Sequence, residues 1–170
     1  MSKDCRCYDK MWLRKDMENM GYIFEYCNKY CFELCNIKID RIKFVNKFMG
    51  SKFRREMETG HPRMLSQAAF DSVRMFIDVD CNGDCKQFEG DKKEPKLAYR
   101  QLYWIGWIYA YLHFKERMYS DLLVKALPIE FMMNEYWVGH EMSKEVYYEH
   151  IKETLKINVR KLEIKNGDTV

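Results

Sequence analysis

Residues 99–114, YRQLYWIGWIYAYLHF, constrain the fold more than any other segment of this chain. Seven of these sixteen residues are phenylalanine, tryptophan or tyrosine, and a single glycine, Gly106, stands near the middle. A helix drawn through the segment is apolar on nearly every side, which is typical of the central helix of a bundle. Gly106 lowers helix propensity by about 1 kcal/mol relative to alanine, so we expect a second helix to cross close to its backbone.

Two other interpretations of the aromatic segment are less favoured. It is too short, and too interrupted by tyrosine, His113 and Arg100, to span a bilayer. Aromatic rings also stack on nucleic-acid bases, but such platforms place the rings beside basic residues on an exposed face. The basic residues near this segment are instead Arg100 and Lys115, close to its two ends. The segment is therefore predicted to form core.

Apolar spacing and helix-capping residues predict further helices along the chain. The expected ranges are 8–34, 40–57, 62–77, 120–126, 128–139 and 143–155. Asn36, Gly60 and Gly139 are expected stops, whereas Asp40 and Ser143 are expected N-caps. The fold class predicted is all-α, a bundle of about six helices around the central aromatic helix.

The chain of 170 residues fits one domain, which we place at residues 1–160. Residues 78–95 are polar and predict a long surface loop. From Lys156 onward a helix extension, an edge strand and a tail all fit, and residues 161–170 are predicted as a flexible tail.

Charge and hydropathy favour a cytoplasmic protein with no membrane segment. Lysine and arginine number 29 against 26 acidic residues, giving a net charge of +3, and this mild balance does not predict nucleic-acid binding. No stretch combines the basic start, apolar run and small-residue cleavage site of a secretion signal.

Seven cysteines are an odd number, and without a secretion signal they are predicted to be reduced thiols. Cys27 and Cys31 fall on the apolar seam of the first helix, where a free cysteine behaves as a small hydrophobic residue. A four-thiolate zinc site would need the spacing of a C-x-x-C knuckle, which the pairs Cys5/Cys7 and Cys81/Cys85 lack.

Residues 78–89, DVDCNGDCKQFE, have the spacing of the twelve-residue calcium loop of an EF-hand. The candidate oxygen ligands are Asp78, Asp80, Asn82, Asp84 and Glu89, with Gly83 at the sharp turn. Residues 91–95 make a poor exiting helix, and the chain offers one such loop where EF-hands usually work in pairs. An acidic loop between two helices is the alternative interpretation.

No catalytic motif accompanies these features. The spacing H-E-x-x-H is absent, because the residue four positions after His140 is Lys144, and no G-x-S-x-G elbow or phosphate-binding glycine loop occurs. His113, His140 and His150 are interpreted as hydrogen-bonded core or capping residues. We therefore expect a protein that is not an enzyme and that has no cofactor, calcium excepted.

Basic residues form a stripe on the second predicted helix. The stripe comprises Lys43, Lys47, Lys52, Arg54 and Arg55. It suits an acidic partner protein or, less well, phosphates of a nucleic acid, and a solvated helix face is the alternative.

The second half of the chain resembles a family of small helical antitoxin-like proteins of gut Firmicutes, often encoded beside ADP-ribosyltransferase-like toxins. The resemblance is carried by the run WIGWIYAY at residues 104–111, then Leu127-Pro128, Met132, Tyr136 and His140-Glu141. It implies a protein-binding inhibitor that occludes a toxin or effector, with Tyr136, Trp137, Glu141 and the basic stripe as candidate contacts. An anti-defence inhibitor of a nuclease, of the anti-CRISPR kind, and a calcium-binding module are the alternatives.

Overall fold

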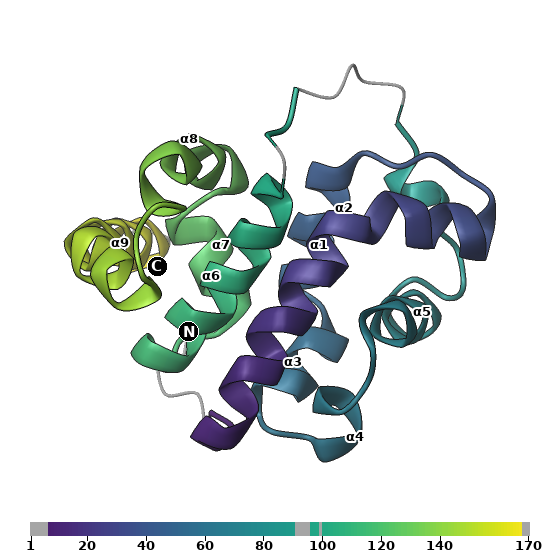
Figure 1. Cartoon of the computed structure of the whole chain (residues 1–170), viewed down its shortest axis with the longest axis horizontal. Coiled ribbons are helices and arrows are strands. Elements are labelled where there is room, and N and C mark those ends of the chain that lie inside the picture. Colours follow the sequence, from purple (N-terminus) through teal and green to yellow (C-terminus); the bar gives the residue numbers. More distant parts are fainter. Residues whose placement is uncertain (1–6, 91–95, 99, 168–170) are drawn as a thin grey trace.

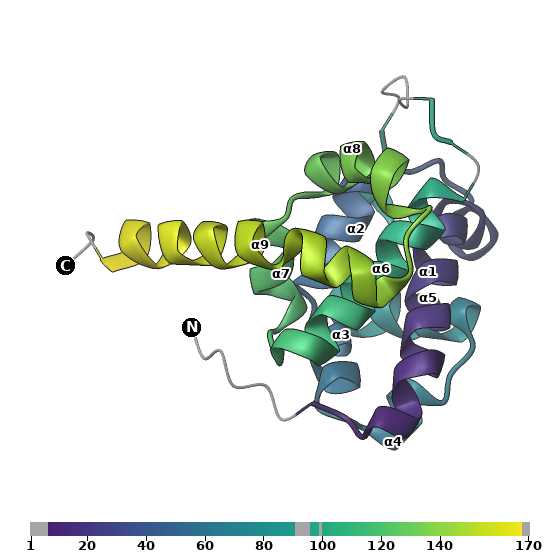
Figure 2. The ribbon, with the colours of Figure 1, turned by 60° about the vertical axis from the view of Figure 1, so that its left-hand side comes forward.

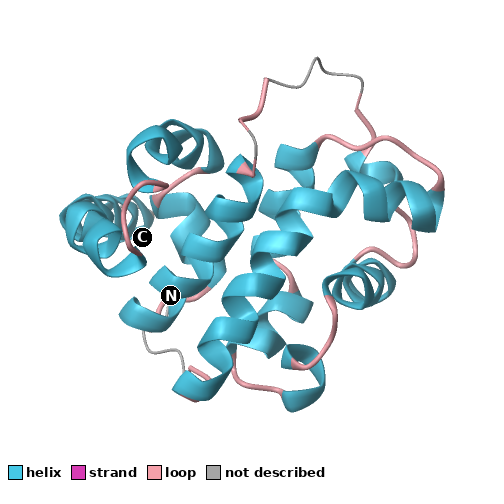
Figure 3. Cartoon of the chain, in the orientation of Figure 1, coloured by secondary structure: helices cyan, strands magenta, loops and turns pink. Residues whose placement is uncertain are grey.

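The computed structural model describes residues 7–90, 96–98 and 100–167, and within those residues it contains helices and no strand (Figures 1 and 3). The all-α prediction is confirmed. In chain order the elements are the 3₁₀ helix η1 (Lys10–Trp12), α1 (Leu13–Cys35), α2 (Arg41–Met49), α3 (Lys52–Glu58), α4 (Pro62–Leu65), α5 (Ala69–Asp80), the 3₁₀ helix η2 (Lys86–Phe88), α6 (Gln101–Glu116), α7 (Ser120–Ala126), α8 (Ile129–Gly139) and α9 (Lys144–Gly167).

The aromatic segment forms α6, which lies antiparallel to α1 at the centre of the molecule (Figure 1). Tyr99, where the segment begins, lies outside the described residues. The central position is confirmed, since Ile105, Ala110 and Tyr111 lie on different sides of the helix and all three are buried.

At Gly106 the backbone of α1 comes close to α6, as the position of this glycine predicts. A Cβ atom there would lie 2.7 Å from the carbonyl carbon of Met20 and 3.0 Å from Cγ of Phe24, and closer still to the Met20 carbonyl oxygen. Contacts under 3.0 Å are essentially never made by a real Cβ, so only glycine allows this crossing.

The other helices form two groups around the central pair. Helices α2 to α5 cover α1 on one side, and α7 to α9 cover α6 on the other (Figure 1). Helix α9 packs through Tyr147, Ile151, Leu155 and Val159, and its last turns project beyond the body of the protein (Figure 2). Among the described residues, no helix combines the length and apolar character needed to cross a membrane.

Several predicted helix ends are confirmed by their capping geometry. Asn36 takes the left-handed conformation, φ 56°, at the end of α1. The Asp40 carboxylate accepts hydrogen bonds from the first backbone N–H groups of α2, and Pro62 begins α4. Ser143 Oγ accepts a hydrogen bond from Val146 N at the start of α9, which is the capping role predicted for it.

The helix predicted over residues 40–57 is wrong in its continuity, because it breaks at Gly50 and Ser51 into α2 and α3. Two sources cap the new N-terminus. Ser51 Oγ accepts a hydrogen bond from Arg54 N at 2.9 Å, and the Asp80 carboxylate accepts from Lys52 N at 2.8 Å and from the next residue at 3.0 Å. Because Asp80 comes from α5, the break depends on tertiary structure.

The helix predicted over residues 62–77 also divides, into α4 and α5, with Ser66 as the C-cap of the first. The predicted polar loop of residues 78–95 begins later, since α5 continues through Asp80, and its residues 91–95 lie outside the described part. Residues 161–167, predicted as a tail, are the helical end of α9, so the helix extension is the arrangement found. Residues 168–170 are also outside the described part.

The prediction that all cysteines are reduced is wrong for one pair. Cys35, the last residue of α1, forms a disulfide with Cys85, directly before η2, with their Cα atoms 6.1 Å apart. The two lie 50 residues apart in sequence, so local spacing does not reveal them. Cys27 and Cys31 are buried thiols on the seam of α1, as predicted.

Candidate functional site

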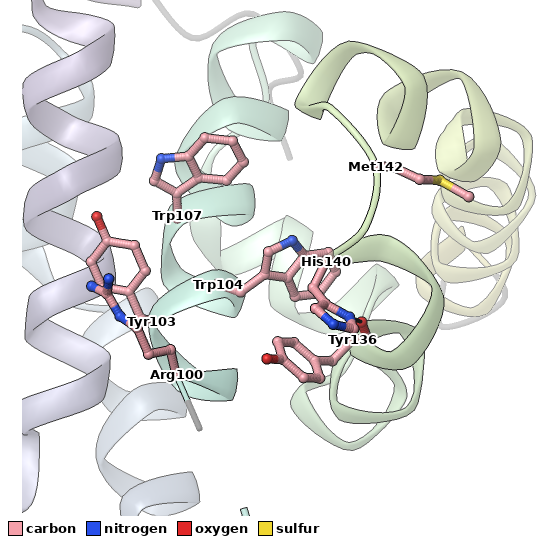
Figure 4. Close-up of a pocket in the computed structure, with 7 residues that line it drawn as sticks. All are labelled: Arg100, Tyr103, Trp104, Trp107, Tyr136, His140 and Met142. Carbon is pink, nitrogen blue, oxygen red and sulfur yellow. Dashed lines mark hydrogen bonds between the residues drawn. The ribbon is translucent and has the colours of Figure 1, made fainter. Parts of the chain in front are cut away.

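A surface hollow lined mainly by aromatic side chains lies between α6 and the end of α8 (Figure 4). Its volume is about 290 Å³. The lining residues are Arg100, Tyr103, Trp104, Trp107, Tyr136, His140 and Met142. We call this feature the aromatic hollow.

One wall of the aromatic hollow is built on the first turns of α6. The Arg100 guanidinium carbon lies 3.9 Å from the centre of the Tyr103 ring, and its Nε lies 3.5 Å from the Glu25 carboxylate of α1. The Tyr103 ring rests on Gly21 of α1, where a Cβ would lie 2.7 Å from the ring. The stacked guanidinium is thus held from two sides, by a π-face and by a carboxylate.

The opposite wall comes from the last turn of α8. The Tyr136 ring stacks on His140, with centroids 4.3 Å apart and planes 13° apart, and meets Trp104 edge-on at 5.7 Å. His140 Nδ1 lies 2.6 Å from the Tyr136 carbonyl oxygen, which can only accept, so Nδ1 carries a hydrogen. His140 Nε2 lies 3.1 Å from the Glu141 carboxylate.

A glycine lets α8 approach this wall. A Cβ at Gly139 would lie 2.7 Å from the Tyr147 ring and 2.8 Å from Cη2 of Trp104. Trp104 is 8% exposed and meets the Tyr147 ring edge-on at 5.0 Å, so the indole is fixed from both sides. Its rotamer is therefore set by packing before any ligand arrives.

The predicted contacts Tyr136, Trp137 and Glu141 are brought together at this corner. Tyr136 lines the hollow, and the Trp137 ring meets it edge-on at 5.6 Å while remaining 64% exposed. The Glu141 side chain is 79% exposed beside His140. Sequence reasoning did not identify the wall of α6, because a helix that is apolar all round gives no signal of which residues stay accessible, such as the half-buried Trp107.

The predicted basic stripe is not one surface, and Arg54 is not a partner contact. Arg54 is completely buried, and its guanidinium binds both carboxylate oxygens of Asp16 at 2.6 and 3.1 Å. Its Nε lies 3.4 Å from the Glu58 carboxylate. The charge predicted to face a partner is instead neutralised inside the protein, because the chain folds a carboxylate onto it from α1.

The other members of the stripe are divided between α2 and α3. Lys43, Lys47 and Lys52 are exposed. Arg55 is half-exposed, with its guanidinium 3.1 Å from the Asp121 carboxylate. The guanidinium carbon of Arg55 also lies 3.5 Å from the centre of the Tyr119 ring.

The structure does not gather the predicted calcium ligands around one point. Asp78 and Asp80 belong to the last turn of α5, and the Asp80 carboxylate is occupied in capping α3. The Asp84 carboxylate accepts from Lys86 N at 2.8 Å, and Glu89 pairs with Ile39 in an isolated bridge. Asn82 is exposed at φ 52°. Within the described ranges, no three histidine, cysteine, aspartate or glutamate side chains form a group able to hold a metal ion.

Comparison with known proteins gives no match, either to a family model, to a curated protein or to a solved structure. The resemblance to antitoxin-like proteins therefore stays a prediction from the residues that carry it.

Proposed function

We propose that this protein is a non-enzymatic, antitoxin-like inhibitor that binds a partner toxin or effector protein through the aromatic hollow and the adjoining Trp137. The observation that carries the proposal is the composition of that surface. Tryptophan, tyrosine, arginine and methionine are the residues most enriched where binding energy is concentrated in protein interfaces. They supply all of the lining of the hollow except His140.

The size of the hollow suits a side chain of a partner. A volume of about 290 Å³ lies at the lower limit of pockets that take small organic ligands, which favours one or two inserted side chains over a large cofactor. An inserted apolar or aromatic residue would meet Trp104 and Trp107, while Arg100 and the adjoining Glu141 offer opposite charges for orienting polar groups of the partner.

Rigidity of the hollow supports binding further. Its walls stand on α6, the most buried helix, and on the turn at Gly139 where α8 meets Trp104. A surface that is already ordered loses little conformational entropy when a partner binds, so more of the contact energy appears as affinity.

The test is co-expression with the toxin-like product of an adjacent gene. We expect the wild-type chain to restore growth and to co-purify with that product, and Trp137→Ala to weaken both. Trp107→Ala removes a ring from the hollow itself and is expected to act in the same direction. Phe32→Ala is the matched control, because Phe32 is a comparably exposed aromatic residue, 55%, on α1.

Two results would contradict the proposal. One is a Trp137→Ala protein that protects cells and binds as well as the wild type. The other is normal growth of cells that express the neighbouring product without this chain, which would mean that there is no toxin to neutralise.

A further inference from the structure

A cysteine and a histidine far apart in sequence meet at the end of the molecule opposite the aromatic hollow along α6. Cys7 Sγ lies 3.3 Å from His113 Nε2, although the two residues are 106 positions apart in sequence. His113 Nδ1 lies 2.8 Å from the Met118 carbonyl oxygen. Because a carbonyl can only accept, Nδ1 carries the hydrogen of the neutral ring, and Nε2 accepts from the Cys7 thiol. His113 is thus placed as the base for that thiol.

Charged groups behind the histidine complete the arrangement. The Glu58 carboxylate lies 3.5 Å from His113 Nδ1, and it also accepts from Ser120 N at 2.8 Å. Burial lowers the pKa of His113, as does the positive charge of Arg54, while Glu58 and Asp16 oppose that shift. The resting imidazole is therefore neutral and able to take a proton, and Glu58 stabilises the imidazolium once it forms.

A cavity opens beside Cys7, and its charge is mainly positive. Its volume is about 500 Å³, and its lining includes Lys10, Lys115 and Arg117 against one carboxylate, that of Asp9. Asp9 is engaged in capping η1 through Met11 N, and the Lys115 ammonium lies 5.2 Å from the ring of Tyr148. The cavity therefore attracts an anion to the neighbourhood of the thiol.

We propose that Cys7 is a reactive thiol that forms a mixed disulfide with a small anionic disulfide entering this cavity. His113 Nε2 takes the thiol proton as the Cys7 sulfur attacks one sulfur of the disulfide. The new S–S bond forms, the old one breaks, and the departing thiolate takes the proton from His113. Cys7 is oxidised to the mixed disulfide, and the departing half is reduced to a thiol.

Thiol–disulfide exchange is favoured over acyl transfer because the chain already holds Cys35 and Cys85 as a disulfide. The other thiols compete poorly. Burial raises the pKa of Cys31 to about 12 and that of Cys81 to about 11, and Cys27 is completely buried. The thiolate is the attacking form, so these three react slowly.

The test compares two probes on the full chain carrying Cys5→Ser, so that only one N-terminal thiol remains. The dianionic probe is 5,5′-dithiobis(2-nitrobenzoate) and the neutral probe is 4,4′-dithiodipyridine, with N-acetylcysteinamide as the reference thiol. The adduct is assigned by peptide mass and by its loss in Cys7→Ser. We expect the rate constant of Cys7 with the anionic probe to exceed that of the reference thiol by about tenfold or more, since a positioned base contributes roughly 100-fold or more.

Two variants separate the base from the cavity. His113→Asn keeps a donor toward the Met118 carbonyl but removes Nε2, and should slow both probes alike. Lys10→Gln combined with Arg117→Gln changes only surface charge, and should slow the anionic probe while sparing the neutral one. The proposal is overturned if Cys7 reacts no faster than the reference thiol, or if a folded His113→Asn protein keeps the wild-type rate. If His113→Asn fails to fold, the proposal is overturned when the charge variant shows the same ratio of reaction rates with the two probes as the wild type.

Discussion

Replacing Gly106 with alanine tests whether the crossing of α1 and α6 sets the packing of this fold. The added Cβ would lie 2.7 Å from the Met20 carbonyl carbon, whereas ordinary contacts begin at 3.4 Å. The two helices must therefore separate by at least about 0.7 Å, the difference between these distances, because the Met20 carbonyl oxygen lies closer still. A gap of that size loses roughly a quarter to a half of the dispersion energy of each contact it opens.

The net cost follows from two opposing terms. Adding a methyl group to a well-packed core costs about 1–3 kcal/mol, and we take the upper end because a backbone carbonyl cannot rotate away as a side chain can. Alanine returns about 1 kcal/mol of helix propensity. We therefore expect Gly106→Ala to lower the free energy of unfolding by about 2 kcal/mol, which corresponds to a fall in Tm of about 4–8 °C for a domain of this size.

Urea unfolding and thermal melting measure this effect, with Gly50→Ala as the control. A Cβ at Gly50 would lie 3.7 Å from its nearest neighbour, the Asn46 carbonyl oxygen, and Gly50 has a negative φ, so the same methyl group meets no obstacle there. The reasoning is refuted if Gly106→Ala is as stable as the wild type, or if the two variants are destabilised equally.

Three further predictions concern the buried charges and the acidic loop. Arg54→Ala leaves the buried Asp16 carboxylate without its bidentate partner and should lower the free energy of unfolding in urea by about 3–5 kcal/mol. The control Lys52→Ala, at an exposed residue, should lower it by less than about 0.5 kcal/mol, and equal losses would contradict the prediction. Burial lowers the pKa of His113, so the unfolded chain binds a proton at this histidine before the folded chain does as pH falls below about 6.5. The free energy of unfolding should therefore fall with pH below about 6.5, and His113→Asn should make that fall less steep. An unchanged slope in the variant would contradict the prediction. Millimolar calcium should leave Tm unchanged, since residues 78–89 are not arranged as a cage, and a rise with calcium but not magnesium would show that they rearrange.

The parts of the fold that could be predicted are those whose signals are local. Asn36 and Asp40 lie beside the helix ends that they cap, and the density of aromatic residues around Gly106 indicates a central helix without knowledge of its neighbours. The break at Gly50 could not be predicted in the same way. Ser51 supplies a local cap, but the second cap is the Asp80 carboxylate, which reaches α3 from 27 and 28 residues away in sequence.

The same distinction applies to the sites. Tyr136 and Trp137 are adjacent on α8. Tyr136 is one of the residues that carry the family resemblance and Trp137 follows it directly, so both could be named from the sequence. The burial of Arg54 could not be predicted, because Asp16 is 38 residues distant and the local partner Glu58, four residues on, is a pairing typical of an exposed helix face. The pair of Cys7 and His113 gave no sequence signal, since only the antiparallel packing of α1 and α6 brings their two segments together.

The position of Gly106 makes the two proposed sites separable by one substitution. The aromatic hollow lies between α6 and the end of α8 and meets α1 through Arg100 and Tyr103, so the rest of its lining moves with α6 and α8. The contact of Cys7 with His113 instead joins the chain leading into α1 to the last turn of α6. A separation of about 0.7 Å would lengthen its 3.3 Å hydrogen bond toward 4 Å and so weaken it. Gly106→Ala should therefore lower the reactivity of Cys7 more than it lowers partner binding, and equal losses of both would mean that the two sites share one mechanical unit.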